Sequence, residues 1–228
     1  MKIYRSSIPL YGIIVALSVF IGVFYIYYHL KKEKISDKNI LLYFVMYIFF
    51  AFVMGKMFTV VASNGEVNIL NAGLSSYGGL IGVVIGSIIF EKILPCDNKI
   101  IKYTILSLPL VYGISKIACF ITGCCYGIPY NGFGNVIYPD GLNIPLFPVQ
   151  IVETIFFLIM FIVCNKFKNN KNIIYITLLL VSITKFSLDF LRYEHLTESI
   201  SFNQKFSILL FLLTIIVFIV KKMNKTSK

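Results

Sequence analysis

Residues 101–121 read IKYTILSLPLVYGISKIACFI, an almost unbroken apolar run with a lysine, Lys116, near its end. A helix needs about 20 mostly apolar residues to cross the hydrocarbon core of a bilayer. The rest of the chain has the same character, since 58% of its 228 residues are hydrophobic. The sequence therefore predicts an all-α integral membrane protein.

Seven apolar segments follow one another along the chain, separated by short loops. They cover residues 8–30, 40–62, 77–94, 101–121, 148–165, 173–192 and 205–220. The first is too long for a signal peptide and has no Ala-x-Ala cleavage site. We therefore expect a single transmembrane domain of about seven helices over residues 1–228.

The net charge of +11 is concentrated in alternate loops. One side of the predicted membrane holds Lys31, Lys32, Lys34, Lys38, Lys92, Lys99, Lys102, Lys166, Lys168, Lys171, Lys221, Lys222, Lys225 and Lys228. The other holds only Lys2, Arg5, Arg192 and Lys205. Cytoplasmic loops carry the excess of Lys and Arg, so we expect an outer N-terminus, a cytoplasmic C-terminus and no nucleic-acid partner. Loop 126–147 is then outside, either as a lid or docking surface or as an ordinary connector.

Three lysines fall inside the predicted spans: Lys56, Lys116 and Lys185. Each charge at the bilayer centre costs roughly 2.5–3.5 kcal/mol on insertion scales, and such residues usually mark functional sites. The abundant anion in a membrane is a phospholipid phosphate, so the lysines favour a lipid-headgroup site. The structural alternative is an ion pair for Lys185 and a snorkelling side chain for Lys56.

Acidic residues accompany these lysines. Asp189 follows Lys185 by four positions, so the two share a helix face and can pair, and Arg192 continues that face. Glu153 lies one turn into the fifth predicted span. With the predicted orientation these groups and Lys116 lie toward the outer half of the membrane, where we expect a polar cavity with more cations than acids.

Glycines recur every four residues in the third predicted span, at Gly78, Gly82 and Gly86. A stripe of small residues lets membrane helices approach closely, and packing is sufficient to explain it. Tyr77 opens the same span, where an aromatic side chain commonly anchors a helix at the interface.

The chain has five cysteines, at positions Cys96, Cys119, Cys124, Cys125 and Cys164. Three of them cluster at the end of the span that carries Lys116. Three interpretations stay open: a Cys119–Cys124 disulfide, a reactive thiolate whose pKa is lowered by Lys116, or simple packing. A metal site is the least expected interpretation, because the C-x4-CC spacing has no second pair and no nearby histidine.

Six motifs in this order resemble the bacterial prolipoprotein diacylglyceryl transferases. They are Tyr11-Gly12, Gly55-Lys56, YGGLIG at 77–82, KIACFITGCCYG at 116–127, FPVQIVE at 147–153 and KFSLDFLR at 185–192. The resemblance implies a seven-span enzyme of the bacterial plasma membrane with the orientation given above. It also implies transfer of a diacylglyceryl group from phosphatidylglycerol to the lipobox cysteine of a prolipoprotein, by a monomer that needs no metal and no cofactor.

The resemblance also implies roles for particular residues. Lys116 is expected to hold the lipid phosphate, and Lys185, oriented by Asp189, a second lipid oxygen. Tyr77 takes the place of the family's histidine as hydrogen-bond donor or activated base, and Cys124 stands at a signature position. The remaining lipid-binding candidates are Tyr11, Lys56, Gly78, Gly79, Cys119, Glu153 and Arg192.

The chain departs from the family pattern at several signature positions. Three family arginines are lysines here, the histidine is Tyr77, two asparagines are Cys119 and Thr122, and a glutamate is Cys124. Ionising a tyrosine of pKa about 10 at pH 7 costs roughly 4 kcal/mol. His195 is a possible substitute base, although a solvated loop histidine is the simpler interpretation. Two alternatives follow: a non-catalytic lipid-binding relative, or a thiol or acyl transferase that uses the cysteines.

Overall fold

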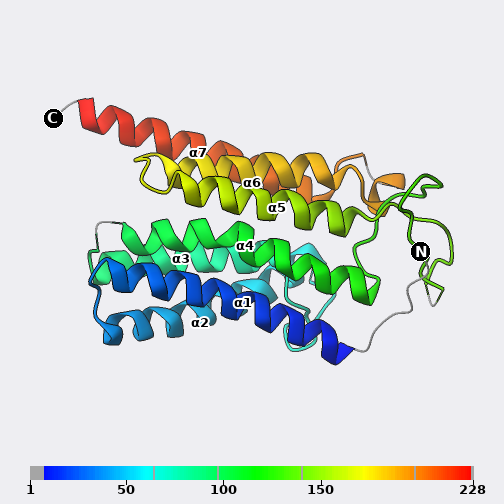
Figure 1. Ribbon diagram of the computed structural model, residues 1–228, viewed down its shortest axis with the longest axis horizontal. Coiled ribbons are helices and arrows are strands. Elements are labelled where there is room, and N and C mark those ends of the chain that lie inside the picture. Colours follow the sequence, from blue (N-terminus) through cyan, green and yellow to red (C-terminus); the bar gives the residue numbers. More distant parts are fainter. Residues whose placement is uncertain (1–7, 64, 97, 140, 198, 227–228) are drawn as a thin grey trace. The chain divides into compact units, whose positions relative to one another are not determined.

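The computed structural model describes residues 8–226 except 64, 97, 140 and 198. Its helices are α1 (Ile8–Lys32), α2 (Asp37–Ala62), α3 (Ser76–Ile93), α4 (Lys99–Thr122), α5 (Val149–Lys166), α6 (Ile173–Asp189), the 3-10 turn η1 (Tyr193–Leu196) and α7 (Phe202–Thr226) (Figure 1). Within the described residues the extended backbone is limited to isolated bridges. The all-α prediction is confirmed.

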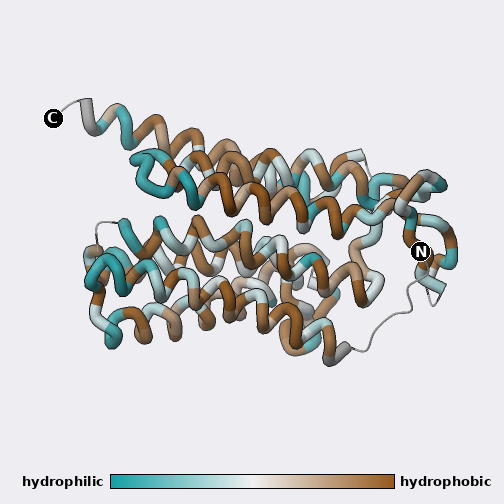
Figure 2. Tube along the Cα trace, viewed as in Figure 1, coloured by the Kyte–Doolittle hydropathy of each residue, from teal (hydrophilic) through white to brown (hydrophobic). Residues whose placement is uncertain are grey.

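Among the described residues, five helices are long and apolar enough to cross a membrane: Leu10–Lys32, Asp37–Ala62, Lys99–Thr122, Val149–Lys166 and Phe202–Asn224. Large apolar side chains such as Phe20 and Phe24 are more than half exposed on α1, as expected of a lipid-facing surface. Figure 2 shows the same pattern, with hydrophobic helices and hydrophilic connections. The helices α3 and α6, of 18 and 17 residues, fall outside this set. The number of spans and their orientation therefore stay predictions.

The chain forms two compact units. Unit 1 comprises Met1–Phe20 and Pro109–Lys228, and unit 2 comprises Ile21–Leu108. The division falls at Pro109, inside α4, where the ring removes a backbone donor from the helix.

Close packing of α2 on α3 through glycines organises unit 2. A Cβ added to Gly78 would lie 2.3 Å from the Met54 carbonyl oxygen, and one added to Gly82 would lie 2.2 Å from that of Phe50. Real Cβ atoms do not approach so closely, so α3 fits against α2 because these positions lack side chains. The small-residue stripe is confirmed as a packing feature.

Charged side chains of unit 2 complete the ends of its helices. The Glu91 carboxylate accepts hydrogen bonds from the backbone N–H groups of Cys96, Asn98 and Ile100, which satisfies donors at the start of α4. Glu33 accepts from the Tyr103 hydroxyl at 2.8 Å and pairs with Lys99 at 3.1 Å. The hydrogen bond from Tyr103 is the main cause that lowers the pKa of Glu33.

In unit 1, α6 lies between α5 and α7 (Figure 1). The end of α4 meets α5 at Gly113, where an added Cβ would lie 3.3 Å from Phe157 and Leu158 side-chain atoms and from the Thr154 carbonyl oxygen. These close approaches bring α4, α5 and α6 together near the residues that the sequence singled out.

The long connection after α4 is folded. Val136, Tyr138 and Leu146 form a small buried core, and the Tyr138 hydroxyl donates to the Phe120 carbonyl at 2.9 Å. Gly127 bridges to Arg192, and a Cβ on it would meet the Phe147 carbonyl oxygen at 2.4 Å. The loop is therefore packed, and its role as a lid, a docking surface or an ordinary connector stays a prediction. Asp140 of the same loop lies outside the described residues.

Candidate functional site

A buried carboxylate, Glu153 on α5, lies at the centre of the polar cluster in unit 1. It is 2% exposed. One carboxylate oxygen lies 3.0 Å from Lys116 Nζ and the other 2.7 Å from Arg192 Nη2. The Tyr112 hydroxyl donates a further hydrogen bond to Glu153 at 3.1 Å. A buried carboxylate requires such compensation, so these side chains form one interdependent group.

A second acid, Asp189 at the end of α6, extends this group. Its carboxylate lies 3.3 Å from Arg192 Nε and 3.4 Å from His195 Nε2, and it accepts a short hydrogen bond from the Ser201 hydroxyl. Arg192 therefore bridges Glu153 and Asp189. The solvated-loop interpretation of His195 is wrong, since its side chain is only 8% exposed and lies against Asp189.

The third cation, Lys185 on α6, is 4% exposed. Its ammonium lies 3.8 Å from the centroid of the Tyr112 ring, and Lys116 approaches the same ring at 4.9 Å. A desolvated cation over an aromatic face gains about 2 kcal/mol or more. The Tyr112 ring thus stabilises two cations close to one another; the expected pairing of Lys185 with Asp189 stays a prediction.

The described cluster has an excess of positive charge. Lys116, Lys185 and Arg192 face two carboxylates, and all five side chains are buried. Unbalanced buried charge is strongly destabilising. The arrangement therefore favours an additional anion, which a lipid phosphate or an ionised thiol can supply.

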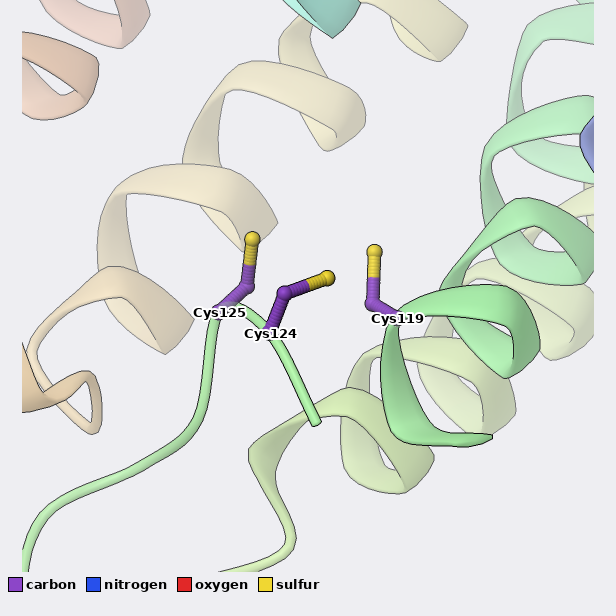
Figure 3. Close-up of side chains that lie close together, drawn as sticks. All are labelled: Cys119, Cys124 and Cys125. Atoms are coloured by element: carbon purple, nitrogen blue, oxygen red, sulfur yellow. The ribbon is translucent and has the colours of Figure 1, made fainter. Parts of the chain in front are cut away.

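Three thiols lie beside this cluster, those of Cys119, Cys124 and Cys125, and their sulfur atoms are all within 4.8 Å of one another. Figure 3 shows Cys119 at the end of α4 and the other two on the connection that follows. No disulfide links the chain's five cysteines, so the structure does not support the disulfide interpretation. Hydrogen bonds from Cys119 and Cys124 lower the pKa of the Cys125 thiol, and the charges of Lys116 and Arg192 act in the same direction.

Of the other predicted site residues, Tyr11 belongs to unit 1. Its side chain is partly exposed, and it lies within electrostatic range of Lys116 and the three clustered cysteines. This placement agrees with a residue that lines the site.

The remaining predicted site residues belong to unit 2. Lys56 Nζ donates to the carbonyl oxygens of Ile69 and Leu70 at 3.0 and 2.9 Å, so it binds the α2–α3 connection. Tyr77 is buried, and its ring stacks on Phe58. Gly78 and Gly79 lie on the face of α3 that packs on α2.

The sequence reasoning missed two members of the cluster, Tyr112 and Ser201. Tyr112 precedes Lys116 by four residues and so shares its helix face, a signal that was available. Ser201 reaches Asp189 only because the chain reverses through η1 (Tyr193–Leu196). No local sequence pattern predicts that contact.

Comparison with known proteins shows which sequences this chain resembles. Residues 1–220 match the family model described as prolipoprotein diacylglyceryl transferase. The phosphatidylglycerol–prolipoprotein diacylglyceryl transferase of Clostridium tetani is 25% identical over 98% of this chain and 97% of its own. That of Clostridioides difficile is 27% identical over 85% and 82%. That of Dehalococcoides mccartyi is 27% identical over 68% of this chain, and the match spans 62% of that relative's length.

Proposed function

Because this chain belongs to the prolipoprotein diacylglyceryl transferase family, we propose that it transfers a diacylglyceryl group from phosphatidylglycerol to the cysteine of a prolipoprotein lipobox. Its apolar helices and bacterial relatives indicate a bacterial membrane protein. We propose further that it has seven spans in the cytoplasmic membrane, with the N-terminus outside, and that it acts as a monomer.

The observation that carries this proposal is the buried excess of positive charge in unit 1. In the proposed complex Lys116 leaves part of its contact with Glu153 to hold the lipid phosphate, and Lys185 holds a second lipid oxygen. Glu153 and Tyr112 keep the two ammonium groups oriented before lipid binds. Arg192 already bridges both acids, so its role is to position them.

The reaction forms one bond and breaks one. The acceptor thiol loses its proton, its sulfur bonds to the terminal glyceryl carbon, and the bond from that carbon to the phosphate oxygen breaks. Glycerol phosphate leaves with the electron pair. The lysine charges offset the charge that develops on this leaving group, which is the electrostatic contribution expected of a transferase site.

A lysine holds phosphate as a point charge, whereas an arginine offers a bidentate fork. Three lysines at positions where the family has arginine therefore predict weaker geometric selection of the lipid oxygens. Tyr77 is proposed as the donor or base that replaces the family's histidine, and Cys124 as a further reactive group. Tyr11, Lys56, Gly78, Gly79 and Cys119 are proposed to complete the lipid site.

A second candidate function is lipid binding without catalysis. It is favoured by the cysteines at 119 and 124, which replace an asparagine and a glutamate of the family signature. In that case phosphatidylglycerol still binds near Lys116, but no thioether product forms.

The decisive test is a transfer assay with the purified protein in phosphatidylglycerol-containing membranes. A synthetic lipobox peptide should gain the mass of one diacylglyceryl group, and Lys116→Ala should abolish the gain. Lys38→Ala, which removes an exposed lysine of α2, is the control and should leave it intact. No gain under conditions in which the Clostridium tetani relative is active would exclude the transfer and leave lipid binding.

A further inference from the structure

The cluster of Cys119, Cys124 and Cys125 has a geometry that the proposed lipid chemistry leaves unexplained. We propose that these three thiolates bind one zinc ion and leave its fourth coordination position open to a thiol. The C-x4-CC spacing argued against a metal because no fourth protein ligand follows in sequence. In three dimensions, however, the three sulfur atoms gather within 4.8 Å of one another (Figure 3).

The distances suit such a site. Zinc–sulfur bonds of about 2.3 Å in a tetrahedral complex place the sulfur atoms about 3.8 Å apart. The three Sγ atoms lie within 4.8 Å of one another. Side-chain rotations that move each sulfur by less than about 1 Å therefore bring them into range. No backbone movement is needed.

The backbone holds the cluster in place. The Cys124 N–H donates to the Cys119 carbonyl at 3.0 Å, and buried Gln150 donates to the Cys124 carbonyl at 2.8 Å. Cys125 has a φ of 51°, in the left-handed region that non-glycine residues seldom adopt. Its conformation turns the side chain toward the same region as that of Cys124 (Figure 3), although consecutive residues of an extended chain point to opposite sides.

The charges of the surroundings also fit. A zinc ion with three thiolates carries a net charge of −1, and the neighbouring cluster of three cations and two carboxylates carries +1. Lys116 and Arg192 both lie within electrostatic range of Cys125. The positive neighbours therefore favour a negatively charged zinc–thiolate complex beside them, as they favour a lipid phosphate.

Exposure differs across the cluster in a way that leaves one side open. Cys119 is buried, Cys124 is partly buried and Cys125 is exposed. Zinc sites with three protein ligands keep a position for an exchangeable group, and soft thiolate ligands favour zinc or Cu(I) over harder ions. The exposed side of the cluster is where such a group can enter.

This site has a consequence that rests on the proposed transferase function. A thiol that coordinates zinc is deprotonated, so the acceptor cysteine would lose its proton to water and remain nucleophilic. Its sulfur then bonds to the glyceryl carbon while the carbon–oxygen bond to the phosphate breaks. The site thereby activates the acceptor without the family's histidine and leaves Tyr77, at that position, the role of hydrogen-bond donor.

The first experiment measures metal binding alone. The full-length, reduced, metal-free protein in detergent is titrated with Co²⁺, a spectroscopic probe for zinc, and we expect one equivalent with thiolate charge-transfer absorption that Zn²⁺ removes. X-ray absorption of the zinc-loaded protein should count three sulfur ligands. Both results need only the unmutated chain, so they do not depend on a variant that folds.

Matched cysteine variants locate the site. Cys119→Ser and Cys125→Ser should lower the metal affinity more than about 100-fold. Loss of a group that only contacts a metal ligand already lowers metal affinity about 10–100-fold. Cys96→Ser and Cys164→Ser, which alter cysteines outside the cluster, should bind as the unmutated protein does. A reduced protein that shows no charge-transfer absorption, or absorption unchanged in the Cys119 and Cys125 variants, would overturn the proposal.

A second experiment separates the metal site from the transferase function. A lipobox peptide should change the Co²⁺ spectrum when it contains cysteine and should not do so when that cysteine is serine. Transfer is then measured with metal-free and zinc-loaded protein. Metal binding without transfer would refute the function and keep the site, whereas full transfer by metal-free protein would refute the role given to zinc and keep the function.

Discussion

The two units use their charged side chains in different ways. In unit 2, Lys56 and Glu91 bind backbone groups at helix connections, and Glu33, which is partly exposed, pairs with lysines nearby. In unit 1 the cluster around Glu153 consists of buried charged side chains that bind one another and keep a positive excess. The charges of unit 2 complete its fold, whereas we propose that the buried cluster of unit 1 serves a ligand.

The largest expected effect concerns which unit supplies the group that acts as hydrogen-bond donor or base. General acid–base catalysis contributes typically 10²–10⁴-fold, and we expect Tyr77→Phe in unit 2 to lower the transfer rate by about that factor. The ring of Tyr77 stacks on Phe58, and phenylalanine preserves that contact. The rate of diacylglyceryl transfer to a lipobox peptide measures the effect.

His195→Gln in unit 1 is the competing variant, because His195 lies against Asp189. We expect it to change the rate only a few-fold. Tyr47→Phe, at another buried tyrosine of α2, is the control. A large loss in His195→Gln together with a normal rate in Tyr77→Phe would assign the base to unit 1.

The next effect concerns stability. Glu153→Gln keeps the side-chain volume but leaves Lys116 and Arg192 without their shared carboxylate, and breaking a buried pair costs about 3–5 kcal/mol. The midpoint of unfolding in detergent should fall markedly. Glu33→Gln, at a carboxylate 29% exposed in unit 2, should cost about 1 kcal/mol or less. Equal losses in the two variants would refute the contrast between the units.

The sequence predicted the helices and most members of the cluster, because both depend on local patterns. Apolar runs indicate helices, and the spacing of Lys185 and Asp189 places them on one helical face. The prediction that Arg192 continues this face is wrong, because α6 ends at Asp189 and Arg192 has an extended backbone. The sequence could not predict that Arg192 bridges Asp189 and Glu153 or that Ser201 reaches Asp189, because these contacts join separate helices. Lys56 shows the converse. The sequence places this lysine inside a predicted membrane span, but it binds backbone carbonyls of the α2–α3 connection.

A smaller effect concerns the affinity for phosphatidylglycerol. It distinguishes direct binding of the lipid phosphate from a general effect of positive charge. A hydrogen bond to a charged group contributes about 1.5–3 kcal/mol, so Lys116→Ala should lower binding of phosphatidylglycerol about 10–100-fold. Lys116→Arg should restore it, since arginine supplies both charge and a fork. Lys38→Ala, at an exposed lysine of α2, should leave binding unchanged. Quantitative lipid binding by native mass spectrometry distinguishes these outcomes, and a Lys38→Ala loss as large as that of Lys116→Ala would mean that net charge alone controls lipid binding.

The smallest effect tests whether the glycine stripe of α3 serves packing alone. Gly82→Ala places a methyl group 2.2 Å from the Phe50 carbonyl oxygen, and overpacking typically costs 1–3 kcal/mol. Gly12→Ala on α1, where no atom lies within 4 Å of the added Cβ, should be neutral or slightly stabilising because alanine favours a helix.

If α3 only packs on α2, Gly82→Ala should lower the unfolding midpoint while the transfer rate per folded molecule stays unchanged. A lower rate in the folded fraction would mean that the spacing of α2 and α3 also positions Tyr77 for chemistry. The glycine stripe of α3 would then affect the reaction through Tyr77 and would not serve packing alone.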